Sequence, residues 1–327
     1  MTVQSIPAHH PTLRPLVRSF MLMEIAASAR NTYARLTVPA SDITAMLFPL
    51  SGCGAYTLDG MTGEVVKLEN AFMHGQISRA NSGGSGFSGA ADENLAMFGI
   101  IFTPIGLQTF VRKEIGAMET IENAFHESRY LVKDSEFLHE KLSAVYDRKQ
   151  RESGVPIPIP STNLQGLAAY AERFLLEQLR CKPIPRGVGA ERNVLQVQYI
   201  CQRLTQTHGN ISIEALAGEL DLSERHISRL MKDYVGVSGE VFGEVQRFMY
   251  ASQSLLSAVR AVPEGSTVSS ERLHTIIHEA GYYDQSHCIR DFKRFAGATP
   301  FQFVRERTAL AERLIGVDEE SGELFKM

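Results

Sequence analysis

The chain has 327 residues, of which 44% are hydrophobic and 21% are charged, and its formal net charge is −4 at pH 7. This composition is too apolar for a disordered protein, and the length suits two or three packed domains. The small acidic excess gives no bulk electrostatic argument for nucleic-acid binding, so any such binding must depend on local positive charge.

The start of the chain and its cysteines indicate the cytoplasm. Residues 1–10 contain neither the basic region nor the apolar core of a secretory signal peptide. The longest apolar stretch, residues 95–107, is too short to span a bilayer and is interrupted by Thr103 and Pro104. The four cysteines are far apart and include no CxxC pair, which favours reduced thiols. We therefore expect a cytoplasmic protein with no membrane association, no metal site and no cofactor.

Residues 18–103 consist of short apolar segments separated by glycine and polar turns, such as ITAMLFPLSG at 43–52. Closely spaced turns of this kind favour an antiparallel β-sandwich or barrel. Helical spacing of apolar residues follows at about 105–112 and 134–149. We therefore expect a mixed sensor and oligomerisation domain over residues 1–155.

Residues 156–189 are predicted to form a linker that carries one amphipathic helix. The alternating prolines of VPIPIPS (155–161) force an extended path, and KPIPRGVG (182–189) forms a second break. These breaks predict that few contacts cross between the flanking domains. A helix at about 163–180 has a single apolar stripe, which either packing on the first domain or dimerisation explains. The stripe consists of Leu164, Leu167, Ala168, Ala171, Leu175 and Leu179.

Residues 190–315 are predicted to form an all-α domain, followed by an acidic, solvated tail at 316–327. Residues with short polar side chains stand where helix N-caps are needed, and glycines stand where helices end. The expected caps are Ser212, Ser223, Ser238, Asp284 and Thr299. The expected helices lie at about 192–207, 212–220, 223–235, 238–260, 270–280, 284–296 and 300–314.

One motif occurs twice in this part of the chain. HISRLMKDYVG (226–236) and HCIRDFKRFAG (287–297) share His, Arg, Lys and Gly at the same positions, at a constant offset of 290 − 229 = 61 residues. Each copy follows a short amphipathic helix, and two short helices with one apolar stripe each must cross to bury those stripes together. The repeat therefore predicts two helix-turn-helix units, joined by the long helix at 238–260.

The outer face of the second helix of each unit has the side chains that reading of the DNA major groove requires. Arginine can donate two hydrogen bonds to guanine, glutamine can pair bidentately with adenine, and serine or histidine can serve several base edges. Lysines one turn further along reach phosphates. The candidate DNA-binding residues are Arg225, Ser228, Arg229 and Lys232 in the first unit, and Gln285, Ser286, His287, Arg290, Lys293 and Arg294 in the second.

These motifs resemble those of a known family. Leu216-Ala217 through Ser223 and Arg229, together with GYYDQSHCIRDFKRFAGATPFQF (281–303), look like the double helix-turn-helix domain of AraC/XylS-type transcriptional regulators. The resemblance covers about 193–307 and is closest to a subgroup with a poorly characterised N-terminal sensor domain.

The resemblance implies specific roles for some residues. It places base reading on Arg225, Ser228 and Arg229 in the first unit, on Ser286, His287 and Arg290 in the second, and a basic position of the central helix on Arg247. It also implies a small-molecule effector and contact with RNA polymerase. The chain departs from the family pattern at Cys288, which replaces a larger apolar residue, at the apolar Ile289, and in the long connection at 261–271.

Two other patterns are weaker. Gly84-x-Gly86-x-x-Gly89 fits the dinucleotide fingerprint, but it neither follows a clear buried strand nor opens a helix, so a flexible loop is expected. His274 and His278 are four residues apart on one predicted helix, but no third metal ligand is evident, and a solvated face or a phosphate contact is preferred.

The sequence thus predicts an α+β chain that is a DNA-binding transcriptional regulator rather than an enzyme. We expect an activator in the form of a cytoplasmic homodimer, whose partners are double-stranded promoter DNA, RNA polymerase and an unidentified small-molecule effector. Two alternatives remain open: a DNA-binding regulator that needs no ligand, and a barrel enzyme fused to a DNA-targeting domain.

Overall fold

A computed structural model of the chain confirms an α+β protein in which a β-rich part precedes an all-α part. None of the helices that it describes is both long and apolar enough to cross a membrane. The described residues are 2–25, 40–51, 54–58, 65–68, 70–79, 85–88, 95–111, 118, 122–123, 125–153, 162–181, 188–261 and 268–305.

The strands of the first domain form two antiparallel sheets. They are β1 (Thr2–Pro7), β2 (Val17–Ile25), β3 (Thr44–Ser51), β4 (Gly54–Leu58), β5 (Val65–Leu68), β6 (Phe72–His74), β7 (Ser85–Ser88), β8 (Leu95–Phe102) and β9 (Phe125–Glu127). The larger sheet has the order β1-β2-β8-β3-β6-β9, and the smaller has the order β5-β4-β7. The expected antiparallel β domain is confirmed.

The register of the larger sheet assembles the core of the first domain. Phe48 of β3 lies opposite Phe98 of β8, and Phe20 of β2 belongs to the same buried cluster. The rings of Phe20 and Phe98 stack with their centroids 6.1 Å apart. These aromatic residues lie far apart in the chain, so the pairing of the central strands is what brings them together.

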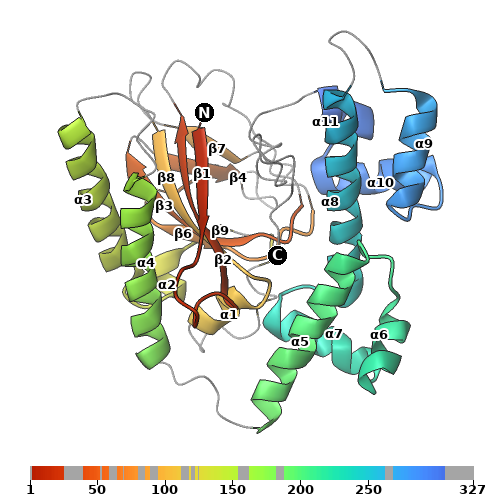
Figure 1. The fold of residues 1–327 in the computed structure, drawn as a ribbon, viewed down its shortest axis with the longest axis horizontal. Helices are drawn as coiled ribbons and strands as arrows, with labels where there is room; N and C mark the ends of the chain where they lie inside the picture. Colours follow the sequence, from red (N-terminus) through yellow and green to blue (C-terminus); the bar gives the residue numbers. More distant parts are fainter. Residues whose placement is uncertain are drawn as a thin grey trace.

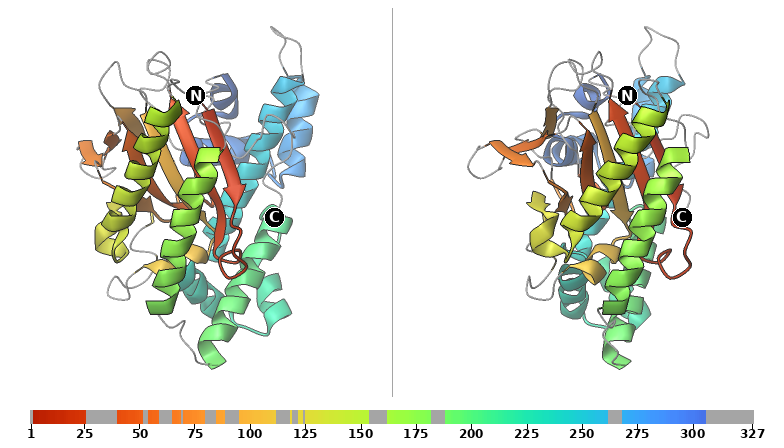
Figure 2. Two further views of the ribbon diagram at one scale, coloured as in Figure 1. Left: turned by 60° about the vertical axis from the view of Figure 1, so that its left-hand side comes forward. Right: turned by 90° about the vertical axis from the view of Figure 1, so that its left-hand side faces the viewer.

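The described part of the first domain also contains four helices, of which α3 and α4 cover one face of the larger sheet. They are α1 (Gly106–Phe110), α2 (Ser128–Leu131), α3 (Ser135–Ser153) and α4 (Thr162–Cys181). Figures 1 and 2 show α3 and α4 side by side across the sheet, and α4 contacts β1 and β2. Leu164, Leu167, Ala171 and Leu175 of α4 are buried in the core of the first domain. Of the two interpretations of this stripe, packing within the chain is therefore correct, and these residues do not form a dimer face.

Helices are the only regular secondary structure among the described residues of the second domain. Its helices are α5 (Val188–Gln206), α6 (Ile213–Leu220), α7 (Glu224–Tyr234), α8 (Gly239–Arg260), α9 (Ser270–Glu279), α10 (Gln285–Ala296) and α11 (Pro300–Arg305). Helix α5 begins four residues earlier than expected, and the predicted continuation of α11 beyond residue 305 lies outside the described residues.

The predicted helix caps are confirmed. Ser212, Ser223, Ser238 and Asp284 each accept a hydrogen bond from a backbone amide three residues further on. Thr299 accepts from the amide of Gln302, whose side chain accepts from the Thr299 amide in return. These reciprocal bonds satisfy amides that an α-helix leaves without partners at its start.

The second domain contains two helix-turn-helix units, here called the first head (α6 and α7) and the second head (α9 and α10). The first head buries Leu216, Ile227 and Leu230 in one cluster, and the second head buries Ile276 and Phe292 in another. Figure 1 shows α8 running from one head to the other, and α8 contacts α7, α9 and α10. The predicted pair of units joined by a long helix is confirmed.

Gly209, in the turn before the first head, is expected to tolerate no side chain. Its φ is +72°, and a Cβ at this position would lie 2.0 Å from the carbonyl oxygen of Gly243 on α8. We expect Gly209→Ala to lower the free energy of unfolding by more than the ~1–2 kcal/mol that left-handed backbone costs a residue with a Cβ. The matched control is Gly218→Ala, because Gly218 is an exposed residue inside α6 with nothing within 4 Å of its Cβ position. That variant should gain up to ~1 kcal/mol, and equal thermal unfolding of the two variants would contradict this account.

The two domains touch at a few points. The backbone amide of Ala40 donates to the carbonyl of Phe295, in the last turn of α10, over 2.7 Å. Ile105 is buried within the core cluster of the first head. A Cβ on Gly236, just after α7, would lie 2.9 Å from the carbonyl oxygen of Met118. The first domain therefore contacts both heads, each near the C-terminal end of its second helix.

A buried ion pair also lies where the first domain meets the second. The guanidinium of Arg18 on β2 donates two hydrogen bonds to the Asp42 carboxylate, at 3.3 and 2.9 Å. The Asp42 side chain is 7% exposed, and the side chain of Gln246 on α8 lies beside it. Burial is the largest single influence and raises the pKa of Asp42, but the charge of Arg18 and the hydrogen bonds from Arg18, Gln246 and the backbone together leave the pKa below its usual value. The pair therefore remains ionised where the first domain meets α8.

Candidate nucleic-acid interface

The buried apolar residues of helix α7 lie on one side of the helix, and its polar residues lie on the other. Ile227, Leu230 and Met231 are at most 1% exposed and fill the core of the first head. Arg225 and Arg229 are exposed, whereas Ser228 and Lys232 are half-buried. The guanidinium of Arg229 lies 3.1 Å from Nδ1 of His226, one turn earlier on the same helix. The four predicted residues of the first head therefore lie on the part of α7 that its core leaves uncovered.

Helix α10 repeats this arrangement. Cys288, Phe292 and Phe295 are fully buried in the second head. The predicted contact residues point away from that core: Gln285, Ser286, Arg290, Lys293 and Arg294 are exposed, and His287 is half-buried. Asp284 caps the helix by accepting from the amide of His287 over 2.7 Å. The repeated motif thus presents an exposed arginine, Arg229 or Arg290, at the middle of each second helix.

The structure gives two of the basic residues roles within the domain. Arg294 forms an ion pair with Glu244 of α8 over 2.7 Å, which ties α10 to the central helix. Arg247 of α8 donates to the carbonyl of Gly209 over 2.9 Å, and its guanidinium lies 5.8 Å from the ring centroid of Tyr282. Arg247 therefore links the start of the first head to the turn of the second.

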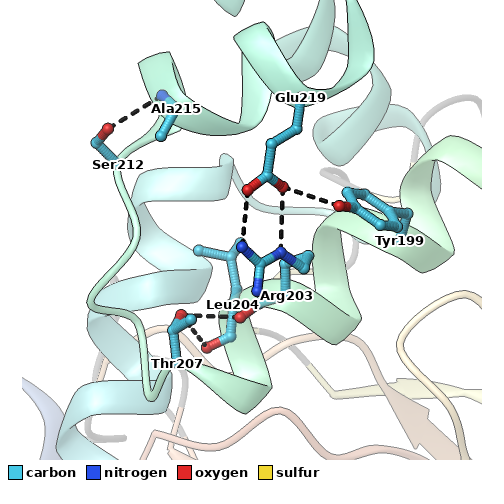
Figure 3. A network of polar contacts seen from close by, with 7 residues as sticks. All are labelled: Tyr199, Arg203, Leu204, Thr207, Ser212, Ala215 and Glu219. Atoms are coloured by element: carbon cyan, nitrogen blue, oxygen red, sulfur yellow. Dashed lines mark hydrogen bonds and ion pairs between the residues drawn. The ribbon is translucent and has the colours of Figure 1, made fainter.

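A polar network that the sequence reasoning missed holds the first head against α5. Arg203 of α5 donates from Nε and Nη2 to the two carboxylate oxygens of Glu219 on α6, at 3.1 and 2.7 Å (Figure 3). The hydroxyl of Tyr199 donates to the same carboxylate over 2.9 Å. These partners are 16 and 20 residues apart on different helices, so no local spacing in the sequence indicates the network.

Two of the three departures from the family pattern, Cys288 and Ile289, lie on α10, and most of the third, the connection at 261–271, lies outside the described residues. Cys288 is fully buried, and burial raises the pKa of its thiol to about 12, so it acts as a small apolar core residue. Ile289 is 36% exposed beside the polar face of α10. Tyr283, just before α10, is 91% exposed, and the sequence reasoning did not single it out as a surface residue.

The structure describes part of the glycine pattern and both histidines of the second weaker pattern. Gly86 lies within β7, so the expectation of a loop is wrong for Ser85–Ser88, whereas Gly84 and Gly89 lie outside the described residues. His274 and His278 are both exposed on α9, and His274 lies 3.2 Å from the side-chain amide of Gln285. Among the described residues, no three His, Cys, Asp or Glu side chains are grouped so as to hold a metal ion.

Comparisons with known proteins found matches among solved structures but not among sequence families or curated proteins. No family model matches the chain, and no curated protein is significantly similar to it in sequence. The C-terminal domain of AraT, a response regulator from Geobacillus stearothermophilus, is 25% identical, with 35% of this chain and 86% of that domain covered and a TM-score of 0.29.

A second neighbour covers both domains. ToxT from Vibrio cholerae is 12% identical, with 88% of this chain and 97% of ToxT covered and a TM-score of 0.42. A structure of ToxT bound to an unsaturated fatty acid is 11% identical, with coverages of 89% and 96% and a TM-score of 0.44. At these TM-scores the likenesses do not decide what this chain does, and its function must be inferred from its own residues.

Proposed function

We propose that this chain is a sequence-specific DNA-binding transcriptional regulator of the AraC/XylS type. The observation that carries the proposal is the duplication of one surface: α7 and α10 each expose an arginine at the same motif position, Arg229 and Arg290, above a buried apolar core. Exposed arginine, serine and glutamine, together with the half-buried His287, suit the donor and acceptor pattern of the major groove.

Local charge supports the same conclusion despite the acidic balance of the whole chain. Four of the proposed contact residues of α7 and α10 are arginines on exposed positions: Arg225, Arg229, Arg290 and Arg294, the last of which is paired with Glu244. The amides at the start of each helix add a partial positive charge where a phosphate would lie. Binding to promoter DNA therefore depends on these two helices rather than on the net charge.

The length of the DNA site is a testable consequence. Because two heads on one central helix must meet successive turns of the major groove, we expect a bipartite site whose halves lie about 10–10.5 bp apart. Selection of bound sequences from a random DNA pool by the full chain measures this directly. Recovery of one compact half-site, or of no preferred sequence, would contradict two-headed reading.

The first domain is proposed to bind a small-molecule effector and to support a homodimer. A regulator that needs no ligand is the competing function, and thermal unfolding with metabolite libraries separates the two. An effector at 100 times its Kd should add about 2.7 kcal/mol to the free energy of unfolding. We further propose action in the cytoplasm as an activator that contacts RNA polymerase, which transcription from a promoter containing the selected site can test.

A further inference from the structure

The two heads have separate apolar cores. On α8, the core of the first head includes Phe242, whereas the core of the second head includes Val245 and Phe248. Among the described residues, the two cores have no member in common. A shared apolar core therefore does not hold one head against the other.

A group of polar contacts joins the heads beside the middle of α8. Arg247 donates from Nη2 to the carbonyl of Gly209, in the turn before α6, and its guanidinium lies 5.8 Å from the ring centroid of Tyr282, in the turn before α10. The side chain of Asn210 occupies the space where a Cβ on Gly281 would lie. We call these five residues the junction. The turn of the first head thus meets the turn of the second both through Arg247 and directly.

Both turns of the junction are held within their own heads. The amide of Gly209 donates to the carbonyl of Leu204 over 2.7 Å, and the amide of Tyr282 donates to the carbonyl of Ile277 over 3.1 Å. The Tyr282 side chain is buried in the core of the second head. Because neither turn is loose on its head, a contact between the turns restrains the heads themselves.

The charge of Arg247 also acts on the recognition helix of the second head. Asp291 of α10 is buried and follows Arg290 directly in the sequence. Burial raises the pKa of Asp291, and the charges of His287 and Arg247 act against that rise. A nearby cation stabilises a buried carboxylate. Arg247 therefore favours the position of α10 in which Asp291 lies close to α8.

We propose that the junction fixes the distance and rotation between the two heads, so that the chain discriminates between DNA sites by the spacing of their halves. This inference rests on the proposed function. One added base pair moves the second half-site by about 3.4 Å and rotates it by about 34° around the duplex. Heads held by the junction do not follow this change, so the DNA must be deformed instead. Long helices bend, so α8 without the junction would tolerate several spacings.

The spacing preference is measured with the selected DNA site and with derivatives that have one or two base pairs added or removed between the halves. The natural chain should bind the best spacing at least about tenfold more tightly than its nearest neighbours, because deforming DNA costs free energy. Arg247→Met keeps an unbranched stem but loses the donor and the charge, and this ratio should fall to about threefold or less. Asn210→Ala should lower the ratio in the same direction. Arg247→Lys, which keeps the charge and a donor, should retain more of it than Arg247→Met.

The matched control is Arg203→Met. Arg203 is also a half-buried arginine that is hydrogen-bonded to another helix, but its partner Glu219 belongs to the first head, and the bond does not join the two heads. This variant should keep the natural spacing ratio, and thermal unfolding verifies that every variant is folded.

Two results of the DNA measurement overturn the proposal. Ratios within about twofold of the natural value in both Arg247→Met and Asn210→Ala leave α8 alone as the determinant of spacing. An equal loss of affinity at every spacing in Arg247→Met, with a smaller salt slope, identifies Arg247 as a phosphate contact instead.

A measurement without DNA separates this inference from the proposed function. Spin labels on genetically encoded ketone side chains replace Glu214 of α6 and Glu279 of α9, which are both exposed, and report the distances between the heads. The distance distribution should broaden in Arg247→Met but not in Arg203→Met, and an unchanged width in Arg247→Met overturns the junction. If the natural chain prefers no DNA sequence, the proposed function fails, and the distances still decide whether the junction holds the heads. If the chain reads DNA but the spacing ratios are unchanged in the junction variants, this inference alone fails.

Discussion

Replacing Arg229 or Arg290 by alanine should weaken binding to the preferred DNA site by ~1–3 kcal/mol and relax the preference at one or two base pairs. Both arginines are exposed at the centre of the second helix of their head. A guanidinium there can donate two hydrogen bonds to one guanine, and a mismatched base removes both. Titration of the two variants against the selected site and against random DNA measures the loss of affinity and of discrimination.

The control for this experiment is Lys232→Ala. Lys232 lies one turn beyond Arg229 on α7, at a half-buried position where we predict a phosphate contact. Loss of the Lys232 side chain should weaken binding to all DNA sequences alike. It should also reduce the slope of log affinity against log salt concentration by about one. Equal losses on specific and random DNA for all three variants would refute base reading by the arginines. A loss of discrimination for Arg229→Ala alone would assign base reading to the first head only.

Asp42→Ala is expected to have the largest effect on stability, about 3–5 kcal/mol, because it leaves the partly buried guanidinium of Arg18 without its partner. Chemical denaturation of the full chain measures this loss. Glu219→Ala removes the partner of Arg203, but both of those side chains are about one-third exposed, so water replaces the lost bonds and the change should be much smaller. A double variant, Arg18→Met with Asp42→Leu, should recover much of the stability, because no unpaired charge remains.

The same ion pair predicts a dependence on pH. The pKa of Asp42 is lowered in the folded protein, so its contribution is complete above the unfolded-state pKa of about 3.9 and is lost as the pH falls through the folded value. The difference in unfolding free energy between the natural chain and Asp42→Ala should therefore stay constant above about pH 5 and shrink below about pH 4. A difference that is constant down to pH 3 would contradict this role of the ion pair.

Local patterns in the sequence were sufficient to predict the two heads. Amphipathic spacing at Leu216 and Leu230, the caps at Ser223 and Asp284, and the repeated arginines all depend on residues within a few turns of one another. Helical periodicity and capping are properties of such short segments, so one sequence is enough to detect them. The β-rich character of the first domain was predicted for the same reason, but its strand order was not.

The tertiary structure alone decided what covers each surface and how the domains meet. The apolar stripe of α4 fits a dimer face or a core equally well, and only its position on the larger sheet selects the core. Arg294 has the cationic side chain expected of a DNA contact, but it pairs with Glu244, which is 50 residues away in the sequence. The Arg18–Asp42 pair likewise joins segments that are distant in sequence. Such contacts depend on strand register and domain packing, and a periodic pattern within one segment contains no information about which distant segment will cover it.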